Sequence, residues 1–172
     1  MKKELLDEFL RVDHAGERAA QTIYKGQIAA LRNHKNVNEL KHMMEQEQEH
    51  LDTFDELINE YKVRPSLFDP VWKSAGFLLG RITGSFGMKA AMACTIAVEE
   101  VIGNHYAQQI KILEDEGKDK KLIKILKKFR DDELDHQNTA IDFDGKNALG
   151  YKAMKFIIQN GCKTAIKIAK KI

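Results

Sequence analysis

Two glutamate–histidine pairs are the residues of this chain whose types and spacing most strongly suggest chemistry. Glu47 and His50 are three residues apart, and so are Glu133 and His136, so each pair lies on one face of a helix. Both pairs fall within stripes of apolar residues, which predicts that they point into a core. An ionised glutamate is costly to bury unless it is paired or bound to metal. The spacing therefore favours two buried metal-binding pairs.

Two further glutamates continue the inward faces of other predicted helices. Glu17 lies seven residues before Tyr24, and Glu99 lies between Val98 and Ile102. Four carboxylates directed at one core would repel one another, and two divalent cations would remove that penalty. Carboxylate oxygens and imidazole nitrogens suit iron or manganese, and the ligand count matches dinuclear sites in helix bundles. We expect a two-metal site whose ligands are Glu17, Glu47, His50, Glu99, Glu133 and His136. The alternative is a buried polar network that binds no metal.

A third Glu-x-x-His match shows that position on the helix is the informative signal. Glu39 and His42 have the same spacing, but they share a face with the polar residues Gln46, Glu49 and Thr53. A chain rich in glutamate gives one such match by chance. We expect this pair to lie in solvent.

Four long segments with helical periodicity must position the six residues. They cover approximately residues 12–33, 36–62, 88–116 and 119–143. Short turns join the first to the second and the third to the fourth, so each pair is antiparallel, and a long connection links the two pairs. Two hairpins with one crossover form an all-α, ferritin-like four-helix bundle. Because 172 residues suit one core, we expect a single domain over residues 1–172.

The unit of one glutamate and one Glu-x-x-His pair occurs once in each predicted hairpin. Glu17 and Glu99 are 82 residues apart, and Glu47 and Glu133 are 86 residues apart. Nearly equal separations are what a bundle with pseudo-twofold symmetry requires.

Two additional helices are expected outside the four. Pro65 and Pro70 interrupt the periodicity in the crossover, and a short apolar helix should follow over residues 71–79, broken by Gly80, Gly84 and Gly87. A basic amphipathic helix should cover residues 149–172. No acidic residue follows Asp144, whereas the lysines beyond it are Lys146, Lys152, Lys155, Lys163, Lys167, Lys170 and Lys171.

Composition excludes several classes of protein. The formal net charge is +2, which gives no sign of nucleic-acid binding. The charge-free stretch Ala90–Val98 is far shorter than a membrane span. The mixed charges at the N-terminus argue against a signal or transit peptide. Cys94 and Cys162 lie in apolar stretches, which favours buried free thiols in a reducing compartment over a disulfide.

Several other polar residues are weaker candidates for the site. His14, His105, Tyr24 and Tyr106 could support the ligands or face a substrate, and structural roles are equally consistent with their positions. The second pair is flanked by two aspartates. Asp132 or Asp135 could hold a ligating imidazole through its remaining N–H, or both could be exposed.

Longer strings of residues resemble the demethoxyubiquinone hydroxylase family of ubiquinone biosynthesis, and they extend over essentially the whole chain. The strings are RVDHAGE (11–17), IYKGQ (23–27), EQEH (47–50), RP (64–65), AMACTIAVEE (91–100), HY (105–106), KKFRDDELDH (127–136) and IIQNGC (157–162).

The resemblance implies a di-iron monooxygenase. Glu47 and Glu133 would bridge two iron ions, and Glu17 and Glu99 would bind terminally. The implied reaction adds one oxygen atom from O₂ to the ring of a polyprenylated demethoxy-benzoquinol. NADH or the quinol itself is the implied reductant, although the chain lacks a glycine-rich dinucleotide motif.

The resemblance also implies work at a membrane surface, because a polyprenyl quinol resides in the bilayer. The apolar crossover, with Trp72, Phe77, Leu78, Leu79 and Ile82, could dip into lipid or line a channel for the tail. The lysine-rich helix could meet anionic head groups. Alternatively, both segments simply cover the bundle. We expect a peripheral protein on the cytoplasmic face of a bacterial inner membrane, with a second copy or other ubiquinone-biosynthesis proteins as candidate partners.

Three competing interpretations remain at this stage. A ferritin-like iron-storage or peroxide-detoxifying protein would share the six ligands, without needing the apolar crossover or the basic tail. A rubrerythrin would carry an additional four-cysteine iron site, and this chain has two cysteines. A non-enzymatic lipid-binding bundle would bind no metal.

Overall fold

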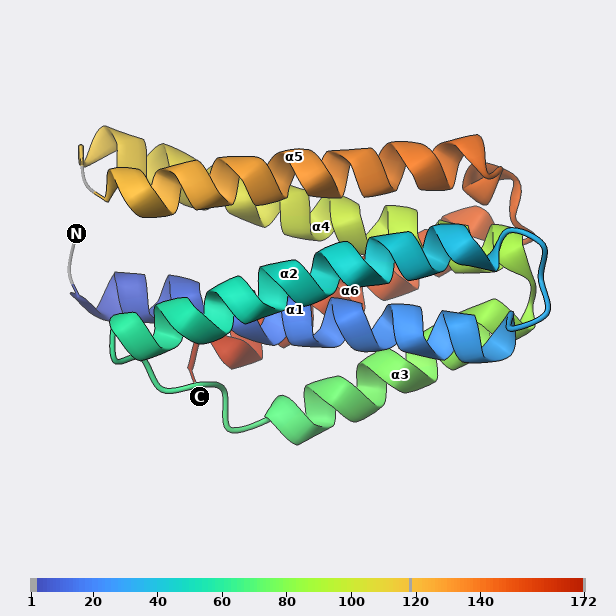
Figure 1. The fold of residues 1–172 in the computed structure, drawn as a ribbon, viewed down its shortest axis with the longest axis horizontal. Coiled ribbons are helices and arrows are strands. Elements are labelled where there is room, and N and C mark those ends of the chain that lie inside the picture. Colours follow the sequence, from blue (N-terminus) through green and yellow to red (C-terminus); the bar gives the residue numbers. More distant parts are fainter. Residues whose placement is uncertain (1–2, 118, 172) are drawn as a thin grey trace.

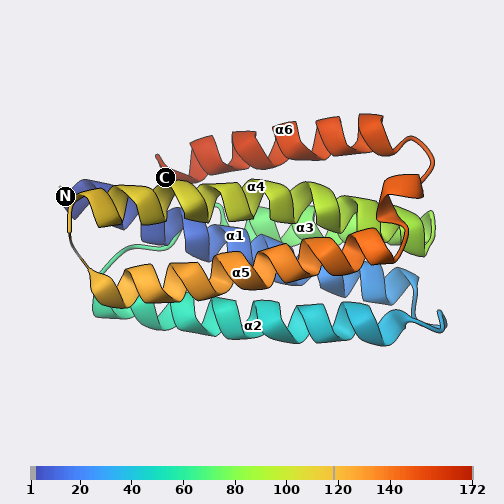
Figure 2. The same cartoon turned by 90° about the horizontal axis from the view of Figure 1, so that it is seen from above.

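The computed structural model describes residues 3–117 and 119–171, and in this part of the chain the regular secondary structure is all helical, without a strand. Figures 1 and 2 show its elements: α1 (Lys3–Ala30), α2 (Val37–Glu60), α3 (Asp69–Ser85), α4 (Met88–Asp115), α5 (Lys120–Asp142), the short 3₁₀ helix η1 (Gly145–Asn147) and α6 (Tyr151–Ala169). The prediction of an all-α fold is confirmed.

Helices α1, α2, α4 and α5 form the bundle. The α1–α2 and α4–α5 pairs each run antiparallel through a short turn, and α3 lies in the long crossover between them (Figure 1). Asp119 begins α5 as an N-cap, because its Oδ1 accepts a hydrogen bond of 3.0 Å from the backbone N–H of Leu122. Gly117 has a φ of +62° after α4, as expected of a helix-terminating glycine. This is the predicted ferritin-like arrangement.

Helix α1 begins at Lys3, nine residues earlier than the periodicity indicated. Its first turns bury Phe9 and Leu10 in an apolar cluster that includes Phe54 of α2 and Leu113 of α4. The prediction failed because the acidic and basic residues near the N-terminus dilute the apolar pattern, while packing against the other helices still stabilises the helix.

Helix α3 was predicted to stop at its glycines, and this was wrong. It continues through Gly80 and Gly84 to Ser85. A Cβ atom on Gly80 would overlap the carbonyl oxygen of Ile23 in α1, and one on Gly26 would overlap the carbonyl oxygen of Phe77. The glycines therefore allow α3 to pack directly on α1, and this tertiary contact offsets their low intrinsic helix propensity.

Helix α6 lies outside the bundle, alongside α4 (Figure 2). It begins at Tyr151, and the predicted end at Ile172 lies outside the described residues. Ile158 and Ala169 are buried, whereas Phe156 and Ile157 are 70% and 68% exposed. Lys155 of α6 pairs with Glu100 at 2.5 Å, and Lys170, directly after the helix, pairs with Glu8 at 3.0 Å. The remaining lysines of the helix face solvent.

Cys94 of α4 and Cys162 of α6 are free thiols in one apolar cluster with Ile158. Burial raises the pKa of Cys94 to about 12 and that of Cys162 to about 11. Both are therefore protonated and unreactive at neutral pH. Across the described ranges, no helix is both long and apolar enough to span a membrane.

Candidate metal centre

The six predicted ligands meet inside the bundle. They come from all four of its helices, and each is at most 2% exposed. Two groups have potential ligand atoms within 4.8 Å of one another: Glu17, Glu47, His50 and Glu133, and Glu47, Glu99, Glu133 and His136. Glu47 and Glu133 belong to both groups. The structure thus brings together two adjacent groups of potential ligands that share two carboxylates, the arrangement expected for a pair of ions.

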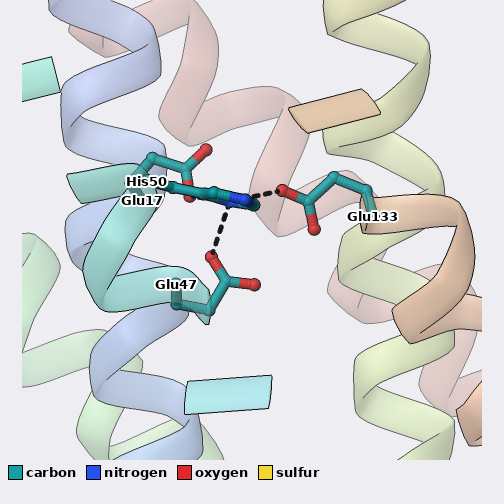
Figure 3. Close-up of side chains that lie close together, drawn as sticks. All are labelled: Glu17, Glu47, His50 and Glu133. Atoms are coloured by element: carbon teal, nitrogen blue, oxygen red, sulfur yellow. Dashed lines mark ion pairs between the residues drawn. The ribbon is translucent and has the colours of Figure 1, made fainter. Parts of the chain in front are cut away.

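Both imidazoles direct Nδ1 toward this cluster. His50 Nδ1 lies 3.3 Å from Glu133 Oε1 and 3.5 Å from Glu17 Oε2. His136 Nδ1 lies 3.1 Å from Glu47 Oε1 and 3.3 Å from Glu133 Oε2. Figure 3 shows Glu17, Glu47 and Glu133 gathered around the ring of His50, from α1, α2 and α5.

Buried polar atoms in the cluster are left without a hydrogen-bond partner in the described part of the chain. They are Glu17 Oε2, both oxygens of Glu47, His50 Nδ1, Glu99 Oε2, both oxygens of Glu133 and His136 Nδ1. A buried polar atom without a partner costs about 1–3 kcal/mol or more, so such a concentration requires compensation. These atoms are carboxylate oxygens and imidazole nitrogens, and divalent iron binds both types of ligand atom. The residues present therefore fit the implied metals.

The pKa values reflect crowded carboxylates. Burial, and then repulsion from Glu133 and Glu17, raises the pKa of Glu47 well above its usual value; burial and repulsion also raise the pKa of Glu99. Burial would lower the pKa of His50, but the carboxylates of Glu133, Glu17 and Glu47 outweigh it and raise the pKa to about 12. Bound cations would favour the ionised carboxylates instead.

The outer nitrogens of the two imidazoles have partners of different kinds. His50 Nε2 lies 3.0 Å from Asp132 Oδ2, and His136 Nε2 lies 3.1 Å from Gln46 Oε1. The prediction that an aspartate beside the second pair contacts an imidazole is confirmed for Asp132, and Asp135 is exposed. These contacts leave Nδ1 of each ring free to bind an ion.

Gln46 was assigned to the polar face of its helix, and that assignment was wrong. It is half-buried and contacts a histidine 90 residues away. A signal was present in the sequence, because Gln46 directly precedes Glu47 as Asp132 directly precedes Glu133. Gln46 and Asp132 therefore occupy equivalent positions under the pseudo-twofold symmetry. Each lies beside the imidazole of the other helix, Gln46 of α2 beside His136 of α5 and Asp132 of α5 beside His50 of α2.

Two buried tyrosines contact the glutamates that were expected to bind terminally. Tyr24 Oη donates to Glu99 Oε1 at 2.8 Å, and Tyr106 Oη donates to Glu17 Oε1. Each tyrosine occupies one carboxylate oxygen and leaves Oε2 free toward the centre. The tyrosines thus hold the two glutamates in place. Tyr24 follows Glu17 by seven residues and Tyr106 follows Glu99 by seven, so the spacing is the same in both halves.

The remaining candidates lie outside the cluster. The third Glu-x-x-His match was predicted to lie in solvent; His42 is exposed, whereas Glu39 is half-buried, and neither belongs to either group of potential ligands. His14 Nε2 lies 2.9 Å from Asp55 Oδ1, and His105 Nε2 lies 3.1 Å from Gln109 Nε2.

Comparison with known proteins agrees with this geometry. Residues 4–169 match the family described as ubiquinone biosynthesis protein COQ7. The chain belongs to the COQ7 family. The resemblance found in the sequence strings is thereby confirmed.

Relatives of the COQ7 family are similar to this chain over nearly its full length. The "NADPH-dependent 3-demethoxyubiquinone 3-hydroxylase, mitochondrial" of Caenorhabditis elegans is 46% identical over 173 residues, which cover 99% of this chain and 92% of the relative. The human protein of the same name is 42% identical, covering 100% of this chain and 80% of the relative. The "3-demethoxyubiquinol 3-hydroxylase" of Rhodospirillum rubrum is 42% identical, covering 98% and 79%.

Proposed function

We propose that this chain hydroxylates the ring of a polyprenylated demethoxy-benzoquinol with O₂, late in ubiquinone biosynthesis. The names of its COQ7-family relatives support this reaction. The observation that carries the proposal is the buried cluster of four glutamates and two histidines, whose inward atoms have no other partner among the described residues. Such a cluster has the composition of a di-iron site.

The residues divide into ligands and supports. Glu47 and Glu133 would bridge two iron ions, Glu17 with His50 would complete one site, and Glu99 with His136 would complete the other. When bound, reduced iron supplies the electrons that activate O₂, which otherwise reacts poorly with closed-shell rings. The protein holds each donor atom in place, and the aromatic ring of Phe129, packed 3.9 Å from His50, helps to keep water out.

An apolar groove offers a place for the substrate's tail. It lies between α3 and α6 on a floor formed by α1 and α4, has a volume of about 80 Å³, and is lined by residues that include Ala19, Trp72 and Ala165. A smaller cavity lined by Glu17 and Tyr106 shares four residues with it: Val12, Gly16, Ile102 and Ile166. We place the part of the prenyl tail nearest the ring in the groove, whose volume suits only a short section of the chain, and this would direct the ring toward Glu17.

The outer surface of α3 and α6 would rest on the membrane. Exposed apolar side chains project from both helices: Phe77, Leu78 and Ile82 from α3, and Phe156 and Ile157 from α6. Exposed lysines on α6 would meet anionic head groups. A peripheral position suits a substrate that remains in lipid. In a bacterium this would be the cytoplasmic face of the inner membrane.

The proposed electron donor is a nicotinamide nucleotide, NADH or NADPH, because several relatives are named as NADPH-dependent. The quinol substrate is the alternative donor. Anaerobic mixing of the iron-loaded protein with either compound alone would identify which one reduces it.

The central test combines a metal count with a quinone profile. Purified protein should contain about two iron ions per chain, the number in a dinuclear site. Cells lacking the protein should accumulate the demethoxy intermediate. Glu133→Ala, which removes a shared carboxylate, should lose iron and fail to restore ubiquinone synthesis.

His42→Ala is the matched control, because it alters the exposed histidine of the third Glu-x-x-His match without touching the buried cluster. It should retain both iron and synthesis. Protein without bound metal would contradict the proposal. Assembly into a large shell, with ubiquinone synthesis retained in Glu133→Ala, would indicate iron storage instead.

A further inference from the structure

The two halves of the cluster differ in the acceptor behind each histidine. On one side, Asp132 of α5 contacts His50 of α2; on the other, Gln46 of α2 contacts His136 of α5. The tyrosine contacts to Glu17 and Glu99 are equivalent in the two halves. A carboxylate therefore stands in one half at the position where the other half has a neutral amide.

This difference changes the donor strength of the imidazoles. A hydrogen bond to a carboxylate is roughly twice as strong as one to a neutral acceptor. By attracting the Nε2 proton, the carboxylate makes Nδ1 of the same ring a better donor to a metal ion. Lys128 Nζ lies 3.5 Å from Asp132 Oδ2, but Lys128 is exposed, so solvent screens most of its influence.

Packing distinguishes the two rings in the same direction. The ring of His50 lies 3.9 Å from that of Phe129, measured between centroids, with an interplanar angle of 32°. The ring of His136 instead faces the ring of Tyr24 edge-on, with the two ring centroids 6.1 Å apart. His50 is thus held more firmly in its orientation, and a ligand held in place loses less entropy on binding.

We infer that the two metal sites bind with unequal strength, and that Asp132 is the positioning residue responsible. The ion held by His50 and Glu17 is bound more tightly. The ion held by His136 and Glu99 is weaker and exchanges first. This inference rests on the proposed metal centre and goes beyond it by assigning an order of filling.

The test is a titration of the metal-free protein with Co²⁺ against a competing chelator. The unaltered chain should bind two ions, the first at least tenfold more tightly than the second. Asp132→Asn should weaken the first step about ten- to hundredfold, the usual cost of losing such a partner, and leave the second within about threefold. Gln46→Glu, the reciprocal change, should strengthen the second step.

Histidine variants assign the steps to the two sites. His136→Ala should retain one ion at the tighter constant, and His50→Ala should retain one ion at the weaker constant. Circular dichroism of each metal-free variant checks that it is folded, and Gln46→Glu supplies an independent arm if Asp132→Asn is not.

The outcomes separate this inference from the proposal beneath it. Equal affinities in the unaltered chain would overturn the inference alone, as would an Asp132→Asn protein that binds both ions normally or loses both equally. Failure of the unaltered chain to bind Co²⁺ would overturn the metal centre together with the inference.

Discussion

At the scale of single residues, the buried ionisable groups make the metal-free protein sensitive to pH. Glu47, Glu99 and His50 all have pKa values above their usual ones. A group whose pKa is higher in the folded state stabilises the fold at low pH and loses that contribution as the pH rises through the folded value. Glu133 behaves oppositely: although burial opposes it, the two histidines lower its pKa to about 2, so its contribution is lost only as the pH falls below 4.5.

We therefore predict that the metal-free fold loses stability as the pH rises above 4.5, the usual pKa of a glutamate, because of Glu47 and Glu99. The loss continues above 6.5, the value for a free imidazole, toward the value of about 12 for His50. Divalent metal should restore that stability, and by more at higher pH, because binding requires deprotonated ligands. Thermal unfolding with chelator and with Fe²⁺, measured anaerobically across this range, tests both statements. Glu47→Gln should flatten the metal-free profile. A Tm that rises with pH without metal would contradict the prediction.

At the scale of elements, the contact between α1 and α3 depends on glycine. Gly76, Gly80 and Gly84 are spaced four residues apart and form one face of α3, where Cβ atoms would collide with α1. At Gly80 the nearest atoms are all backbone atoms of Ile23, so a change of side-chain rotamer cannot relieve the collision there. This packing holds the apolar crossover helix against the bundle beside the groove.

Gly80→Ala should therefore destabilise the protein by about 2–3 kcal/mol, the upper part of the usual range for overpacking. Gly161→Ala in α6 is the matched control, because a Cβ there meets nothing within 4 Å. It should stabilise the protein by about 0.5–1 kcal/mol through higher helix propensity. Denaturant unfolding of the two variants measures the difference. Equal effects would show that the close packing of α3 is not required.

At the scale of the whole molecule, α3 and α6 form an outer layer outside the four-helix bundle, in which α3 packs on α1 and α6 packs on α4 (Figures 1 and 2). The two helices share an apolar cluster through Leu79 and Ile158. Both helices carry exposed apolar side chains, and residues of both line the groove beside the cavity at Glu17. Membrane contact and substrate entry would therefore occur on the same side of the molecule.

Replacing both Phe156 and Ile157 with serine should reduce binding to anionic lipid vesicles at least tenfold, because inserting one such side chain contributes about 1.5–3 kcal/mol. Flotation with vesicles measures the bound fraction. Leu134→Ser is the matched control, since Leu134 is 53% exposed on α5, away from the outer layer. It should bind like the unaltered chain. Undiminished binding of the double variant would show that α6 does not meet the membrane.

Tertiary contacts decided several features that no local pattern indicated. The early start of α1 depends on Phe9 packing against Phe54, and the length of α3 depends on Gly80 meeting Ile23. Local propensity and periodicity predicted a shorter helix in both places. Packing between helices can stabilise backbone that its own sequence favours only weakly, so these boundaries could not be read from the chain alone.

The sequence by itself determined the four bundle helices, their pairing into hairpins and the six inward side chains, because all of these follow from helical periodicity and from the cost of burying charge. The sequence narrowed the partner of one imidazole to Asp132 or Asp135, and only the tertiary structure selected Asp132 and identified Gln46 as the partner of the other imidazole. Gln46 and Asp132 acquire their roles from histidines 90 and 82 residues away. Such contacts depend on how two helices lie side by side, and the spacing of residues within one helix does not by itself determine that placement.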